Sequence, residues 1–206
     1  MKICFTYPLK MVGRLYSLKV FLDTNALIAL SGLSGTAIAG DFITNCRTAE
    51  VVLCVSHIQV DEKVNREMRN YQTRIDKAVR DLRNLGLETR LEPTAIGVYD
   101  TSRWDMSRFG GDDENALYHK LLELISACDQ ATGKKGDATR DAIIGVSALD
   151  HDLFLVCDEC LFQSFQSATA SLNNLQPRLP KTILRKPTPE DVANGILEFT
   201  KVHKPL

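Results

Sequence analysis

The sequence predicts an α/β protein with a central, mostly parallel sheet and helices on both faces, a three-layer α/β/α arrangement. Short apolar runs at residues 18–22, 50–55 and 153–156 alternate with longer segments of helical periodicity, the order typical of parallel strands joined by crossover helices. The runs are continuous rather than alternating, as expected for strands buried on both faces. With 206 residues and 44% hydrophobic content, the chain is long enough for one fairly large domain with a normal core.

We expect residues 1–17 to form an N-terminal tail and residues 18–206 to form a single domain, with a helical and loop elaboration over about 64–135. The net charge of −1 provides no global basic field, so a nucleic-acid partner would need local basic patches or metal ions. No run approaches the ~20 apolar residues of a membrane span, and the N-terminus has no convincing secretory signal. We therefore expect a cytoplasmic protein with no membrane partner.

The first strand, at residues 18–22, ends directly in Asp23, Thr24 and Asn25, which precede a short apolar helix. A carboxylate at the end of a central strand is costly to bury without a partner. Asp23 is therefore expected either to cap the helix or to bind a ligand. A helix over about 36–47 then leads to the second strand, at 50–55.

A long helix is predicted over about 57–85, with Ser56 as its N-cap and Glu62 in its first turns. Its apolar residues recur at a spacing close to a heptad, which fits a projecting arm, packing against another helix or a homodimer seam. A second, basic stripe is either a solvated face or a phosphate-contacting surface. This stripe consists of Lys63, Arg66, Arg69, Arg74, Lys77, Arg80 and Arg83.

Residues 89–111 are expected to form an irregular loop, and residues 112–129 another helix. Lys134 and Lys135 then precede a helix opened by Asp141, and a buried strand at 153–156 ends just before Asp158. Carboxyl ends of parallel strands are where ligands bind in open α/β sheets. The chain is expected to continue with a short helix at 162–169, a weak edge strand at 179–184 and a final helix from 188 to about 201.

The six cysteines do not form a recognisable metal motif. Cys157 and Cys160 make a lone C-x-x-C, but no second ligand pair completes a structural zinc site. Cys54 and Cys157 fall in apparent buried strands, so we expect them to be small core residues in a reducing compartment.

Four acidic residues can converge on one edge of the sheet: Asp23, Glu62, Asp141 and Asp158. Clustered carboxylates raise one another's pKa unless a cation neutralises them, and oxygen ligands favour Mg²⁺ or Mn²⁺. With such a metal, the site could hold a phosphodiester and activate a water. No Ser-His-Asp set or Gly-rich phosphate loop competes with this interpretation.

Three segments carry these acids: VFLDTNALIAL at 20–30, VSHIQVDEK at 55–63 and DAIIGVSALDHDLFLVCDECLF at 141–162. Together they resemble the PIN domain family, which consists largely of metal-dependent ribonucleases and includes VapC-like toxins. The resemblance implies a PIN-like fold. It also implies that the four acids are catalytic residues and metal ligands, with Thr24 and Asn25 as auxiliary polar groups. Asp137 would be a further ligand or a helix cap.

The implied function is a Mg²⁺- or Mn²⁺-dependent endoribonuclease in which a metal-activated water attacks RNA. Arg66, Arg69, Lys134 and Lys135 would position the RNA backbone. The protein could then be the toxin of a toxin–antitoxin pair, with an antitoxin protein as its partner. The alternative is a non-catalytic RNA- or partner-binding protein that keeps the fold. A haloacid-dehalogenase-like phosphatase is disfavoured because Asn25 stands where its second aspartate is needed.

Overall fold

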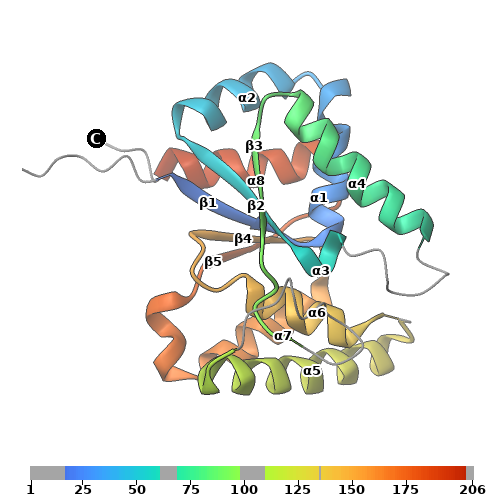
Figure 1. Ribbon diagram of the computed structural model, residues 1–206, viewed down its shortest axis with the longest axis vertical. Coiled ribbons are helices and arrows are strands. Elements are labelled where there is room, and N and C mark those ends of the chain that lie inside the picture. The colour runs from blue at the N-terminus through green and yellow to red at the C-terminus, as the bar shows by residue number, and fades with distance from the viewer. Residues whose placement is uncertain (1–16, 61–68, 98–109, 135, 203–206) are drawn as a thin grey trace, which may run out of the picture.

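The computed structural model describes residues 17–60, 69–97, 110–134 and 136–202, and its centre is a five-stranded sheet (Figure 1). All strand pairs are parallel, in the order β3-β2-β1-β4-β5. The strands are β1 Leu18–Leu22, β2 Val51–Ser56, β3 Glu88–Glu92, β4 Leu153–Val156 and β5 Lys181–Leu184. The predicted α/β class with a parallel sheet is therefore confirmed.

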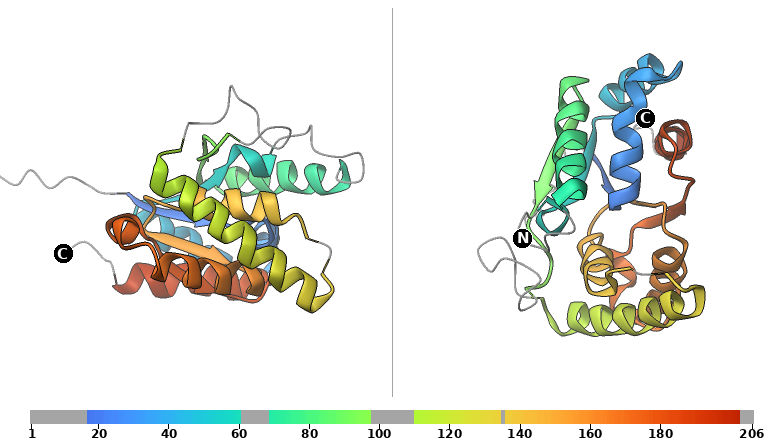
Figure 2. Two further views of the ribbon diagram at one scale, coloured as in Figure 1. Left: turned by 90° about the horizontal axis from the view of Figure 1, so that it is seen from below. Right: turned by 90° about the vertical axis from the view of Figure 1, so that its right-hand side faces the viewer.

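Helices cover both faces of the sheet, as the views in Figures 1 and 2 show. One face is covered by α1 Thr24–Ser31, α2 Ala39–Thr48, α4 Arg69–Asn84 and α8 Pro189–Val202. The other is covered by α5 Asp112–Thr132, α6 Ala138–Ser147 and α7 Glu159–Ala170. Short helical segments are α3 His57–Val60, η1 Gly32–Gly35 and η4 Asn173–Arg178.

The central strands are buried on both sides because their alternate side chains enter two different cores. In β1, Val20 and Leu22 contribute to the core under α1, α4 and α8, whereas Phe21 enters the core under α5, α6 and α7. Phe154 of β4 packs edge-on against Phe21 in that second core. The continuous apolar runs of the sequence correspond to this two-sided burial.

The edge strand β3 corrects the expectation that residues 89–111 are an irregular loop. Residues 88–92 pair in parallel with β2, from Val52 with Glu88 to Ser56 with Glu92. The segment reads ETRLE and is exposed or only half-buried, so it lacks the apolar run by which a strand is recognised. The rest of that predicted loop from residue 98 to 109, including Trp104, lies outside the described residues.

The predicted long helix appears as α3 and α4, and residues 61–68 between them lie outside the described part. Ser56 ends β2 and directly precedes α3, and its hydroxyl accepts a hydrogen bond from the Ile58 amide at 3.4 Å, as expected for an N-cap. The apolar stripe of α4 is an intramolecular packing surface: Ile75, Val79 and Leu82 are buried in the core that α1 shares. On the other side of α4, Lys77 is exposed and paired with Asp81 one turn away.

Two further helix starts differ from expectation. The helix α6 begins at Ala138, three residues before Asp141, and α7 begins at Glu159 rather than at 162. The C-terminal predictions are confirmed: β5 is an edge strand, and α8 begins at Pro189 after Thr188, whose hydroxyl accepts a hydrogen bond from the Asp191 amide.

Among the described residues, no single helix has both the length and the apolar composition to cross a membrane. The pair 24–35 and 39–48 passes that test only when its two parts are joined, and they are bent by 117°. In the fold, Leu27, Leu30 and Phe42 of this pair are fully buried in the core.

We expect Leu82→Ala to destabilise the protein, because Leu82 is fully buried between α4 and the sheet. Truncating a buried leucine costs about 2–5 kcal/mol of unfolding free energy. Urea denaturation followed by circular dichroism measures this, with Val202→Ala, 73% exposed, as the control. Equal unfolding midpoints for the two variants would contradict the assignment of this stripe to the intramolecular core.

Candidate functional site: an acidic cluster at the sheet edge

The structure brings three of the four predicted acids to the carboxyl edge of the sheet. Asp23 follows β1 directly, and Asp158 lies two residues beyond β4. These strands are neighbours and pair Leu22 with Leu155, so their ends coincide. Asp141 lies in the first turn of α6, and the charges of Asp158 and Asp23 both raise its pKa.

The buried side chain of Asp23 accepts hydrogen bonds from backbone amides in two segments and is also a candidate metal ligand. Its side chain is 2% exposed. One oxygen accepts a hydrogen bond from the Ala26 amide at 2.6 Å, which caps α1. The other accepts from the amides of Cys157 at 2.7 Å and Asp158 at 3.3 Å. Burial raises the pKa of Asp23 to about 6, although the three amide donors act in the opposite direction.

Asp158 caps α7 and also carries an ion pair. Its Oδ1 accepts a hydrogen bond from the Leu161 amide at 3.0 Å, and its Oδ2 contacts the ammonium group of Lys134. Lys134 reaches this place because α5 ends at Gly133, whose left-handed backbone (φ 68°) turns the chain back. The residue predicted to contact RNA thus pairs with one acid of the cluster and offsets part of its negative charge.

The surroundings of Lys134 keep its side chain positively charged. Burial alone would lower its pKa, but the hydrogen bond to Asp158 and the charges of Asp158, Asp141 and Asp129 outweigh burial and raise the pKa. An ammonium group that stays protonated partly balances the negative charge of the cluster.

Asp141, unlike the other two aspartates of the cluster, does not cap a helix. The cap of α6 is Asp137, whose side chain accepts a hydrogen bond from the Arg140 amide at 3.2 Å. The Asp141 carboxylate accepts no hydrogen bond from the described residues. Burial, followed by the charge of Asp158, raises its pKa to about 7 despite the opposing charge of Lys134. Asp141 therefore titrates close to neutrality.

Gln59 connects the short helix α3 to the end of β1. Its buried amide donates hydrogen bonds to the Leu22 carbonyl at 3.0 Å and to the Thr24 hydroxyl at 3.3 Å. Its amide oxygen accepts from the Ser56 backbone at 2.7 Å. Thr24 is thereby held in a structural role, and Asn25 is exposed on α1. No sequence signal distinguished Gln59 from an ordinary first-turn residue.

Several predicted site residues fall outside what the structure describes. These are Glu62, Arg66 and Lys135. For Arg69, only its place as the first residue of α4 is described. The proposed roles of these residues remain predictions.

Asp129 is a further buried acid that sequence reasoning missed. It lies near the C-terminus of α5, is 6% exposed, and its two oxygens accept no hydrogen bond within the described part of the chain. Its charge acts on Lys134. An acid in the last turns of a helix opposes the helix dipole, and this unfavourable placement is the signal that could have identified it.

The cysteines near the site differ from the expected arrangement. Cys160 is bonded to Cys128 in a disulfide that joins α7 to α5, so the C-x-x-C residues are not a pair. The sequence predicted reduced thiols and gave no indication of this disulfide. Cys157 is a free, half-buried thiol. A hollow of ≈ 580 Å³ beside the disulfide is lined by Lys134, Cys157 and Asp158, among others.

The donor chemistry of the cluster fits a hard divalent cation such as Mg²⁺ or Mn²⁺. All its side-chain ligand atoms are carboxylate oxygens. Burial, followed by neighbouring charges, raises the pKa of Asp141, burial raises the pKa of Asp23, and Lys134 offsets only part of the negative charge. In the described structure, no three carboxylate oxygens, one from each aspartate, all lie within 4.8 Å of one another. A cation held by Asp158 would have to replace Lys134 there.

No protein-family model, curated protein or solved structure matches this chain. The resemblance to PIN domains therefore stays a prediction from the three sequence segments.

We expect the stability of the protein to fall as the pH rises from about 4 to about 7. The Asp141 carboxyl ionises near 3.8 when unfolded and near 7 when folded, so the folded state binds the proton more tightly between these values. Asp141→Asn should remove this part of the pH dependence, about 3 kcal/mol between pH 5 and pH 8 at 1.36 kcal/mol per pKa unit. Urea unfolding at pH 5 and pH 8 measures it, with Asp76→Asn on α4 as the control. The same pH dependence in both variants would contradict the assignment.

We also expect Lys134→Met to raise the pKa of Asp141 further, because the Lys134 charge lowers that pKa in the wild type. Carbon-detected NMR titration of the aspartate carboxyl groups reports the change directly. Lys120→Met, which breaks an exposed pair with Glu123 on α5, is the matched control. An Asp141 titration that Lys134→Met leaves unchanged would place the ammonium group elsewhere in solution.

Proposed function

We propose that this protein is a Mg²⁺- or Mn²⁺-dependent endoribonuclease with a PIN-like fold. The observation that carries the proposal is the meeting of Asp23, Asp141 and Asp158 at the carboxyl edge of β1 and β4. Burial, followed by neighbouring charges, raises the pKa of Asp141, and burial raises the pKa of Asp23; perturbed acids of this kind are typical of functional sites. The same charges would attract a divalent cation.

The three aspartates would have different roles in cation binding, because the backbone fixes some of their side chains more firmly than others. Backbone amides orient Asp23 and Asp158, so these two would provide a rigid part of the cation site. Asp141 carries no such hydrogen bond and would adjust to the cation. A bound Mg²⁺ would supply charge stabilisation for a phosphodiester and lower the pKa of water.

When no metal is bound, the ammonium group of Lys134 would occupy the place of a cation beside Asp158. Its ammonium contacts Asp158 and lies in the wall of the ≈ 580 Å³ hollow. Displaced from Asp158, it would face that hollow and could bind a backbone phosphate of RNA without reading its sequence. This interpretation retains Lys134 as an RNA-contacting residue.

A second candidate, a non-catalytic RNA- or partner-binding protein, is supported by the capping roles of the acids. Asp23 and Asp158 each cap a helix, and Lys134 neutralises part of their charge. These interactions give two of the acids a structural purpose that requires no metal. Metal-independent RNA binding without cleavage would support this candidate.

The decisive test is cleavage of a panel of labelled RNAs with Mg²⁺, with Mn²⁺ and with EDTA. We expect metal-dependent cleavage that Asp141→Asn reduces at least about a hundredfold, as for loss of one group that stabilises charge in a transition state. Asp141 is chosen because it caps no helix, so its replacement should preserve the fold. Asp76→Asn on α4 should cleave like the wild type.

Cleavage that persists in EDTA, or that Asp141→Asn retains in full, would rule out the proposed site. RNA binding by folded, metal-loaded protein that cuts no member of the panel would favour the non-catalytic candidate.

A further inference from the structure

A second cluster of ligand-type side chains lies away from the aspartates and has a different chemistry. It consists of Cys54 in β2, Glu92 at the end of β3 and His151 in the turn before β4. One potential ligand atom of each lies within 4.8 Å of the other two. Within the described residues, no other group of three or more acids, histidines and cysteines meets this criterion.

The sheet register brings the three side chains to the same face. Phe21 pairs with Cys54, which pairs with Arg90 of β3. Glu92 lies two residues beyond Arg90 and therefore points to the same side of the sheet. The His151 ring packs on that face with its centre 4.9 Å from the centre of the Phe21 ring. The cluster thus depends on three segments that are far apart in sequence.

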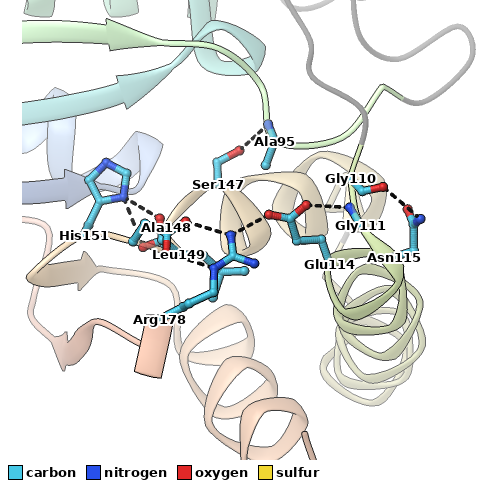
Figure 3. Close-up of polar contacts among 11 residues, drawn as sticks. Ala95, Gly110, Gly111, Glu114, Asn115, Ser147, Ala148, Leu149, His151 and Arg178 are labelled. Carbon is cyan, nitrogen blue, oxygen red and sulfur yellow. Dashed lines mark hydrogen bonds and ion pairs between the residues drawn. The ribbon is translucent and has the colours of Figure 1, made fainter. Parts of the chain in front are cut away.

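The imidazole of His151 is already oriented as a metal ligand would be. Its Nδ1 lies 3.2 Å from the Ala148 carbonyl and 3.0 Å from the Leu149 carbonyl (Figure 3). Carbonyl oxygens only accept, so Nδ1 carries the proton and Nε2 has the lone pair. Metal-binding histidines commonly donate their second N–H to a backbone carbonyl in this way.

The Nε2 atom of His151 has no hydrogen-bond partner in the described structure, although the residue is only 8% exposed. Buried polar atoms without a partner are rare in proteins, and each one calls for an explanation such as a bound ion. Burial also lowers the pKa of His151, which keeps the ring neutral and able to bind a cation.

The thiol of Cys54 is fully buried and lies 3.7 Å from Oε1 of Glu92. Burial, with the nearby charge of Glu92, raises the pKa of this thiol to about 12. Without a metal the sulfur therefore keeps its proton and shares a weak S–H···O contact with the carboxylate. A cation bound by the sulfur would displace that proton to solvent.

A cavity of ≈ 220 Å³ gives access to this cluster. Glu92 and His151 line it, together with Lys19 and Ser147. The Ser147 hydroxyl accepts a hydrogen bond from the Ala95 amide at 3.2 Å, which fixes the segment after β3 to the end of α6 (Figure 3). The cavity is large enough for a water to complete the coordination of a cation.

We propose that Cys54, Glu92 and His151 form a binding site for Zn²⁺ or a divalent ion of similar thiol affinity. One sulfur, one imidazole nitrogen and one carboxylate oxygen are the ligand types that zinc takes, and three protein ligands with an open fourth position are typical of accessible zinc sites. Mg²⁺ is excluded as the favoured ion because it prefers oxygen ligands alone. The proposal does not depend on the ribonuclease proposal.

The test is titration of the full chain with Co²⁺, a spectroscopic substitute for zinc, in buffer free of thiol reductants. We expect one equivalent to produce a thiolate-to-cobalt charge-transfer band, and added Zn²⁺ to remove it. Cys54→Ser and His151→Gln should each lose the band. Cys46→Ser, which replaces another free buried thiol in the opposite core, should retain it.

Asp141→Asn should also retain the band, which separates this site from the acidic cluster. Circular dichroism establishes that each variant is folded. Because Cys54→Ser changes a core residue, X-ray absorption of the zinc-loaded wild type provides a measurement without a variant, and it should show one sulfur per zinc. A folded wild type that gives no charge-transfer band, a band that Cys54→Ser keeps, or a zinc shell without sulfur would overturn the proposal.

Discussion

The buried carboxylate of Asp23 is the interaction on which the acidic edge depends. It caps α1 through the Ala26 amide and holds the amides of Cys157 and Asp158 at the end of β4. Leaving one buried amide without its acceptor costs about 1–3 kcal/mol. The two bonds from the Cys157 and Asp158 amides therefore hold the ends of β1 and β4 together, and the bond from the Ala26 amide fixes the start of α1. Because Asp158 then caps α7, the same network determines where the second acid of the cluster lies.

Holding the carboxylates of the cluster close together at this edge has an electrostatic cost. Burial and mutual repulsion raise the pKa values of Asp23 and Asp141 towards neutrality, so the charged cluster destabilises the fold at neutral pH. Lys134 relieves part of this repulsion through its contact with Asp158. A divalent cation would relieve more of it, which is the physical basis for linking this edge of the sheet to metal-dependent chemistry.

The two candidate sites differ in the hardness of their ligands. Carboxylates make up the cluster at the ends of β1 and β4, whereas Cys54, Glu92 and His151 combine sulfur, oxygen and nitrogen on the face that α5, α6 and α7 cover. Ions with different ligand preferences could therefore occupy the two sites without competing. The fold provides both because a parallel sheet collects residues from distant segments along its edge and across its faces.

The sequence alone determined the α/β class, the central strands β1, β2 and β4, and the position of Asp23 and Asp158 just beyond two of those strands, because apolar runs and turn residues are local signals. Only the tertiary structure revealed β3, the contact of Lys134 with Asp158, and the Cys128–Cys160 bond. The strand β3 is charged and lies at the sheet edge, so its only evidence is its pairing with β2. The meeting of Cys54, Glu92 and His151 likewise depends on strand register and on packing over Phe21, and long-range contacts of this kind leave no periodic pattern in a single chain.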